Sequence, residues 1–185
     1  IIIDEQHKFG VKQRKLLSDK GGRNCDVLLM SATPIPRTLT MTLYGDMDLS
    51  IIREKPKFRK EIKTYSKLES KIEDVIKFVK KELKQDNQIF WVCPLIEESK
   101  KIDHESVVKK FTYLKKIFPD VVGILHGKVD QYEKEKILQD FLNKKYKILV
   151  STTIIEVGID FPNANLIVIE NANKFGLSQL HQLRG

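Results

Sequence analysis

The chain has 185 residues, of which 41% are apolar and 31% are charged, and this balance suits one domain or parts of two with a packed core. No apolar run approaches the roughly 18–20 residues that span a bilayer. Two widely separated cysteines and no basic-flanked leader exclude a disulfide framework, a cysteine zinc site and a signal peptide, so we expect a cytoplasmic protein.

The net charge of +8 is unevenly distributed along the chain. Residues 54–118 carry 17 basic and 11 acidic side chains, which accounts for +6 of the total. A clustered basic surface favours an anionic partner such as nucleic acid, although a solvated lysine-rich surface explains the charge equally well.

Short apolar runs without alternation predict parallel strands that are covered on both faces. Helical spacing of apolar residues predicts helices between them, the last of which opens with the capping pair Asp130 and Glu133. Pro36 suits the first turn of a further helix, which Gly45 ends. Strands that alternate with helices indicate the α/β class, with parallel sheets flanked by helices. The predicted strands are 1–3, 26–30, 88–93, 121–125, 147–151 and 166–170, and the other helices are 69–85, 106–118 and 130–143.

The charged, proline-containing stretch EKPKFRK marks a domain boundary. We interpret residues 1–53 as the end of a first α/β domain, 54–61 as a linker and 62–185 as most of a second domain. Because residues 1–53 contain few strand candidates and no complete layer, we expect this part to be the less stable one.

Two acids, Asp4 and Glu5, follow the first predicted strand directly. Functional groups of α/β sheets gather beyond the carboxyl ends of the strands. An apolar strand that ends in Asp-Glu is typical of the Walker B motif of nucleotide hydrolases. There Asp4 would hold Mg²⁺ through water, and Glu5 would orient or deprotonate the attacking water. A strand that ends in two solvated acids is the simpler explanation of this motif alone.

The segment SATP, which begins at Ser31, follows the second predicted strand. By itself it is equally compatible with a Ser/Thr turn before a proline-started helix. The order DExH, helix, strand and SAT is that of superfamily 2 helicases, and this spacing makes the helicase interpretation the stronger one.

Seven segments cover nearly the whole chain in this order: DEQHKFGVKQR, SATPIPRTLTMTLYGD, VCPLIEESK, LHGKVDQYEKEKIL, TTIIEVGID, PNANLIVIENANKFGL and LHQLRG. Together they resemble the C-terminal half of the helicase core of the RecG family of bacterial ATP-dependent DNA helicases. The transcription-repair coupling factor Mfd shares SATPIPRTL and the TTIIE-type motif, and is the alternative within the enzyme class. QIFWVCPLIEESK, DEQH and His181 in LHQLRG resemble RecG and not that factor.

The resemblance implies two RecA-like domains, ATP and Mg²⁺ as cofactors, and a monomer that remodels branched or duplex DNA. Asp4 and Glu5 match the metal-binding and water-activating pair, and Gln6 and His7 would sense the γ-phosphate. The resemblance assigns coupling of ATP to domain motion to Ser31, Ala32, Thr33, Gly158, Asp160 and Gln182.

The resemblance also implies DNA contacts. Thr152 matches a position that contacts a DNA phosphate, and a hydroxyl beside exposed backbone N–H groups suits that role. Arg37 is a candidate for a DNA or interdomain contact, with a structural ion pair as the alternative. His126 and Gly127 are expected to shape a turn rather than to bind DNA. The lysine-rich helix faces at 77–84 and 109–116 are expected to be solvated, and Trp91 to lie in the core.

The chain contains no GxxxxGK[ST], and the motif that opens with Gln182 stops at Gly185, before the arginines that follow in the family. ATP hydrolysis needs the P-loop, the acids and the arginines around one nucleotide. We therefore expect the isolated chain to hydrolyse little or no ATP, as a fragment of a longer protein or the product of a broken gene. The alternatives to an enzyme are a non-catalytic DNA-binding module and an inert remnant.

Overall fold

The computed structural model describes residues 1–4, 20, 25–31, 48, 50–52, 54, 61–94, 100–152 and 161–184. The chain divides into two compact units, unit 1 with residues 1–61 and unit 2 with residues 62–185. The helix predicted from Pro36 to Gly45 lies outside the described residues. Within the described part, no helix is long and apolar enough to cross a membrane.

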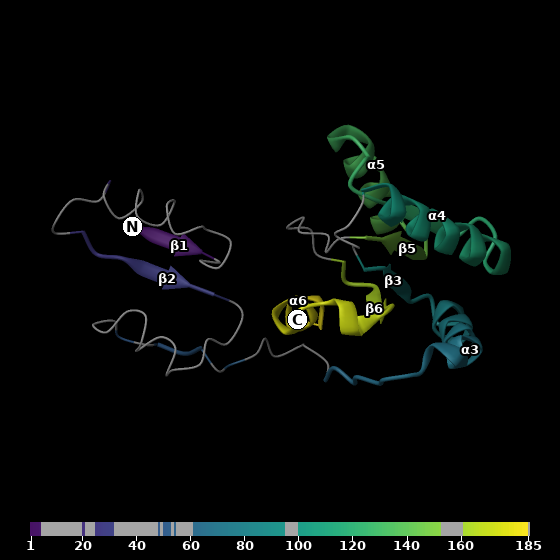
Figure 1. Ribbon diagram of the computed structural model, residues 1–185, viewed down its shortest axis with the longest axis horizontal. Helices are drawn as coiled ribbons and strands as arrows, with labels where there is room; N and C mark the ends of the chain where they lie inside the picture. The colour runs from purple at the N-terminus through teal and green to yellow at the C-terminus, as the bar shows by residue number, and fades with distance from the viewer. Residues whose placement is uncertain are drawn as a thin grey trace. The chain divides into compact units, whose positions relative to one another are not determined.

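Unit 1 contains a parallel pair of strands, β1 (Ile2–Asp4) and β2 (Leu28–Met30), which Figure 1 shows side by side. Both strands lie where the apolar runs predicted them. Ile3 is 7% exposed, whereas Ile2 and Leu28 are 70% and 54% exposed. The backbone N–H of Leu28 donates to the carbonyl of Ile1, and the N-terminal amine donates to the carbonyl of Asp26.

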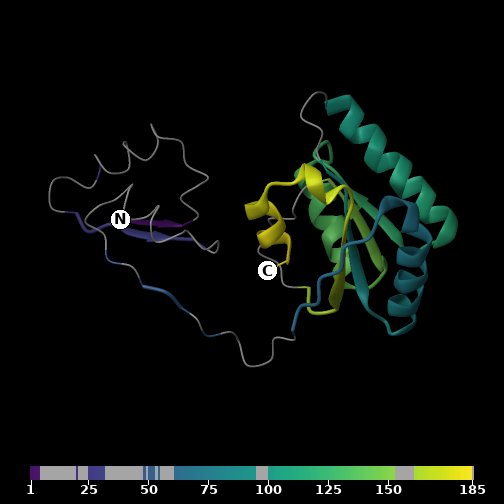
Figure 2. The same ribbon diagram turned by 60° about the horizontal axis from the view of Figure 1, so that its bottom comes forward.

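Unit 2 is built around a four-stranded parallel sheet with the order β4-β5-β3-β6. The four strands confirm the runs predicted from residue 88 onwards and, with the flanking helices, the α/β class (Figure 2). In chain order the elements are η2 (Glu69–Lys71), α3 (Ile72–Lys84), β3 (Gln88–Val92), α4 (Lys100–Ile117), β4 (Val122–Leu125), α5 (Gln131–Leu142), β5 (Ile148–Ser151), β6 (Ala164–Ile169), η3 (Ala172–Lys174) and α6 (Leu177–Arg184).

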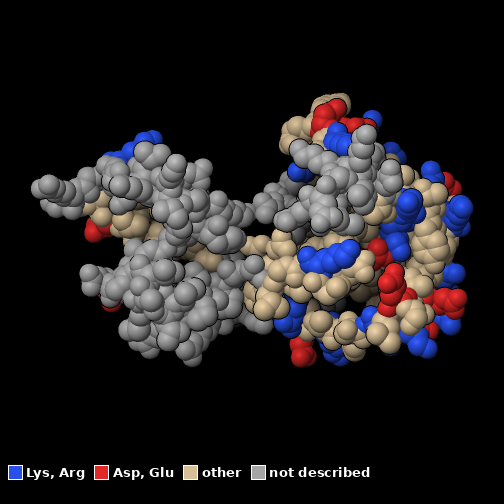
Figure 3. Space-filling view, viewed as in Figure 1, with Lys and Arg blue, Asp and Glu red and all other residues tan. Residues whose placement is uncertain are grey.

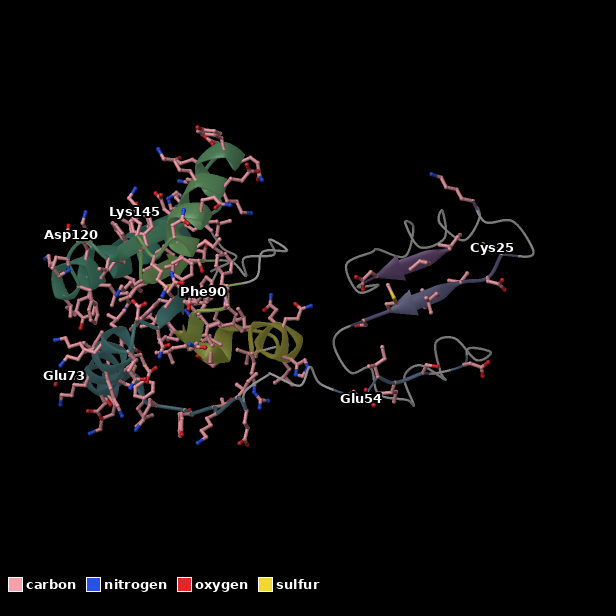
Figure 4. All side chains as sticks on the ribbon, turned by 180° about the vertical axis from the view of Figure 1, so that it is seen from behind. Cys25, Glu54, Glu73, Phe90, Asp120 and Lys145 are labelled. Carbon is pink, nitrogen blue, oxygen red and sulfur yellow. The ribbon has the colours of Figure 1, made fainter. Side chains whose placement is uncertain are left out.

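Two apolar clusters cover the two faces of this sheet. On one face α3 and α4 pack against β3 and β5, with Trp91 fully buried as predicted. On the other face α5 packs through Phe141, whose ring centroid lies 5.0 Å from that of Phe90 and 5.5 Å from that of Phe161. Figure 4 shows Phe90 among the side chains of unit 2. Because successive strand residues face opposite sides, a strand between two helical layers needs apolar residues throughout.

In unit 2, charged residues occupy the left-handed position that follows two of the helices, a position at which glycine is common. Asp86 after α3 and Lys144 after α5 both have a φ of 61°, in the left-handed region. The next backbone N–H in each case donates five residues back, from Asn87 to Glu82 and from Lys145 to Asp140, and so satisfies the helix end. The Lys144 ammonium pairs with the Asp86 carboxylate, which also accepts from Lys147 at 2.8 Å.

Helix boundaries agree with the sequence prediction where the apolar period is strong. Asp130 caps α5, and its carboxylate accepts from the N–H of Glu133 at 2.8 Å, as the capping pair predicts. α4 begins at Lys100 rather than at Ser106, because Ile102 is the only apolar residue of its first six and the period is not visible there. No helix was predicted at α6.

Candidate functional site

The carboxyl edge of the unit 1 sheet brings together two of the predicted site residues. β1 and β2 run parallel with Asp4 opposite Met30, so Ser31, the next residue, lies at the same edge as Asp4. Both side chains are exposed, and both interact within the chain. The structure therefore places the first acid of DEQH and the first residue of SAT at one edge.

Among the described residues, Asp4 supplies a carboxylate at this edge, and this fits Mg²⁺, which proteins usually hold through one or two carboxylates together with water and phosphate oxygens. Within the described residues, no group of three or more His, Cys, Asp or Glu side chains could hold a metal ion. The other predicted site residues of unit 1, and those of the segment TTIIEVGID in unit 2, lie outside the described residues, and their roles stay predictions. They are Glu5, Gln6, His7, Ala32, Thr33, Arg37, Gly158 and Asp160.

The carboxyl edge of the unit 2 sheet carries Thr152 directly after β5. Thr152 is only 4% exposed, so little of this residue is available to a DNA phosphate, and the contact stays a prediction. Its neighbour Ser151 is 1% exposed, and its hydroxyl has no hydrogen-bond partner among the residues that the structure describes.

The loop after β4 forms the turn that the sequence predicted. The N–H of Val129 donates to the carbonyl of His126 at 3.1 Å, and the N–H of Lys128 donates to His126 Nδ1 at 3.3 Å. A Cβ added at Gly127 would meet nothing within 4 Å. The turn itself therefore does not need glycine for space.

α6 positions Gln182, the predicted coupling residue nearest the end of the described chain. The Gln179 side chain accepts from the N–H of Gly176 at 3.0 Å, and the N–H of Leu180 donates to the Gly176 carbonyl at 3.0 Å. The first bond is one half of a capping box and the second is the first helical hydrogen bond of α6, which explains why the helix begins after Gly176. Gln182 is half-buried on this helix.

Sequence reasoning missed a polar cluster at the same edge as Thr152. The Lys110 ammonium lies 2.5 Å from one carboxylate oxygen of Glu170, and Cys93 Sγ lies 3.7 Å from the other. The ammonium also lies 5.7 Å from the centroid of the Trp91 ring and 5.2 Å from that of Tyr113. Sixty residues separate Lys110 from Glu170, and no local pattern links them.

The cluster keeps the Cys93 thiol protonated. Burial, and then the nearby Glu170 carboxylate, raise the pKa of Cys93 to about 12, while Lys110 opposes the shift. A thiol in this state is a poor nucleophile and a poor metal ligand. Cys93 therefore acts as a core residue.

The lysine-rich faces of α3 and α4 are exposed as predicted, with Lys110 as the exception. In Figure 3 the basic side chains on the visible face of unit 2 are interspersed with acidic ones. The charge excess of the middle third thus does not gather into one continuous patch on this face.

Comparison with known proteins connects this geometry to a family. Residues 70–185 match the helicase conserved C-terminal domain. The ATP-dependent DNA helicase RecG of Thermotoga maritima is 50% identical over 187 residues, and that of Aquifex aeolicus is 54% identical. Each alignment covers all of this chain and 24% of the relative, so the chain spans about a quarter of their length.

Solved structures agree with the sequence relatives. A structure of RecG bound to a three-way DNA junction matches 99% of this chain and 23% of that chain, with a TM-score of 0.69 and 44% identity. Yeast Dbp5 bound to RNA and ADP BeF3 matches 91% of the chain with a TM-score of 0.58 and 19% identity, which supports the RecA-like helicase fold alone. The chain therefore belongs to the helicase family whose conserved C-terminal domain it carries, and along its whole length it is similar to the RecG helicases.

Proposed function

We propose that the chain is part of an ATP-dependent DNA helicase that remodels branched DNA, such as replication forks and Holliday junctions, in recombination and repair. The observation that carries the proposal is the unbroken similarity to RecG over the whole chain. The protein would act as a monomer in the cytoplasm, with ATP and DNA as its partners.

In this function the residues around DEQH would serve ATP hydrolysis. Asp4 would hold Mg²⁺, which when bound stabilises negative charge on the phosphates. Glu5 would orient the attacking water and accept its proton, and Gln6 and His7 would sense the γ-phosphate. What supports this assignment is the position of Asp4 at the carboxyl edge of a parallel pair, beside the start of SAT.

The remaining site residues would couple hydrolysis to movement along DNA. Ser31, Ala32 and Thr33 would respond to the state of the acids, and Thr152 and Arg37 would contact DNA. In unit 2, Gly158, Asp160 and Gln182 would respond to the nucleotide. The role of Gln182 rests on the resemblance to RecG, and this residue is half-buried on α6.

A chimera tests the proposal directly. Residues 1–185 replace the matching segment of the Thermotoga maritima RecG, and ATP hydrolysis is measured with and without a three-way DNA junction. We expect junction-stimulated hydrolysis in the chimera. Glu5→Gln should keep ATP binding and lose about 10²–10⁴-fold in turnover, because a positioned general base contributes that much.

Glu61→Gln, an exposed acid in the same unit, is the matched control and should leave turnover unchanged. Undiminished hydrolysis in Glu5→Gln would refute the role of Glu5. A chimera that folds and binds the junction but shows no hydrolysis would refute the enzymatic function.

A further inference from the structure

Glu170 lies where β6 ends and the chain turns towards α6. β6 ends at Ile169, and the N–H of Glu170 still donates to the carbonyl of Val92 at 2.9 Å. Asn171 then adopts a left-handed conformation with a φ of 47°, and η3 follows at once. Glu170 is thus the last residue whose backbone is held by the sheet.

The Glu170 carboxylate is held from two further elements. Lys110 reaches it from the middle of α4, and Cys93 reaches it from the end of β3. The side chains of Lys110 and Glu170 are only 22% and 20% exposed, so solvent screens this ion pair less than the surface pairs of unit 2. Breaking such a pair by removing one partner leaves a partly buried charge without compensation.

The aromatic rings beside Lys110 restrict where the ammonium can go. The ammonium lies near the Trp91 ring, which is fully buried, and near the Tyr113 ring. A cation within about 6 Å of a ring centroid is attracted to the face of that ring. The two rings therefore add to the attraction that keeps the Lys110 ammonium beside Glu170.

We propose that Glu170 is a positioning residue, whose pairing with Lys110 fixes the end of β6 and through it the placement of α6 and Gln182. This inference rests on the proposed function, because Gln182 matters only if α6 takes part in ATP coupling. The chain from Glu170 to α6 consists of η3 and a short connection, so a shift at Glu170 passes to the helix. A misplacement of about 1 Å, even one caused by a change far from the reacting atoms, can lower turnover by about 10²-fold.

The first experiment uses the chimera and separates kcat from KM for ATP. Glu170→Gln keeps the size of the side chain and removes its charge, and we expect kcat to fall on the order of tenfold with KM changed less than about twofold. Lys110→Met should also lower kcat and leave KM nearly unchanged. Lys110→Arg keeps the positive charge and should therefore lower kcat less than Lys110→Met does. The double variant should be no worse than either single variant, since both remove one interaction.

Asp140→Asn is the matched control, because Asp140 also forms an ion pair within unit 2, with Lys145 at 2.9 Å, but from a helix that does not lead to α6. It should leave kcat unchanged. An equal fall of kcat in Asp140→Asn and Glu170→Gln would assign the effect to general stability and overturn the proposal. An unchanged kcat in Glu170→Gln would overturn it as well.

The second experiment does not depend on ATP hydrolysis and is made on the 185-residue chain. Hydrogen exchange of the amides in α6 should be at least about tenfold faster in Glu170→Gln than in the parent, with β3 and β5 unchanged. Unchanged exchange in α6 would refute the positioning role even in an inactive chimera. Failure of the proposed function appears instead as a parent chimera without hydrolysis while α6 still responds to Glu170→Gln.

Discussion

The two units place similar parallel strands in different surroundings. In unit 2, residues of β3 and β5 are fully buried, because α3 and α4 cover one face and α5 covers the other. In the described part of unit 1, Ile3 is the one buried apolar residue, and Ile2, Leu28 and Ile52 are 70%, 54% and 93% exposed. An apolar run thus predicts a strand, but the burial of that strand depends on layers contributed by the rest of the fold.

The largest expected difference between the units is in hydrogen exchange. Amides in β3 and β5 should exchange only on global unfolding, whereas those in β1 and β2 should open locally, because Ile2 and Leu28 are largely exposed and this strand pair buries little apolar surface. We expect protection factors at least about a hundredfold higher in β3 and β5, measured by mass spectrometry on the intact chain. Equal protection factors in the strands of unit 1 and unit 2 would contradict the expected difference in stability between the units.

A core truncation should affect the two units unequally. Phe141 is fully buried and packs against Phe90 and Phe161, so Phe141→Ala should lower the free energy of unfolding of unit 2 by about 3–5 kcal/mol. Ile3→Ala should cost at most about 2 kcal/mol, since its sheet is covered less completely. Urea denaturation followed by circular dichroism measures the free energy of unfolding of each variant. Equal losses in Phe141→Ala and Ile3→Ala would show that Ile3 is packed as well as Phe141.

The smallest expected effect concerns acid stability within unit 2. Hydrogen bonds from Lys144 and Lys147 lower the pKa of Asp86 from 3.8 to about 2. A lowered folded pKa adds stability above pH ~3.8, and this contribution is lost as the pH falls from there to about 2. Asp86→Asn should therefore flatten the pH dependence of the melting temperature in this window.

Asp120→Asn is its control. Asp120 has the same left-handed conformation, with a φ of 63°, and the described residues show no ion pair for it. Asparagine tolerates this conformation, so neither substitution introduces backbone strain. If the melting temperature of Asp86→Asn depended on pH as that of the parent does, the ion pairs of Asp86 with Lys144 and Lys147 would not contribute to folding stability.

Much of the fold could be predicted because parallel strands leave a simple mark. Six predicted strands were found, since each run is apolar on both faces, but the further strand-like stretch at residues 49–53 forms no strand in its described residues 50–52. α6 escaped prediction because its eight residues are largely polar and its start depends on a side-chain cap from Gln179. The first part of α4 escaped for a similar reason.

The candidate site could be predicted only where its residues follow strands. Asp4 and Ser31 were identified from spacing, and the parallel register explains why they share an edge. The pair of Lys110 and Glu170 depends on how α4 crosses the sheet towards β6, which no local pattern encodes. The burial of Thr152 likewise follows from packing around β5 and not from its motif.

Trp91 gives the chain an optical property that follows from its position. It is the only tryptophan in the sequence, and it lies fully buried in β3, one of the two central strands of the unit 2 sheet. Its fluorescence therefore reports the unfolding of the unit 2 core in which it lies. Fluorescence and circular dichroism, recorded together on the unlabelled chain, can thus separate the melting of one unit from that of the other.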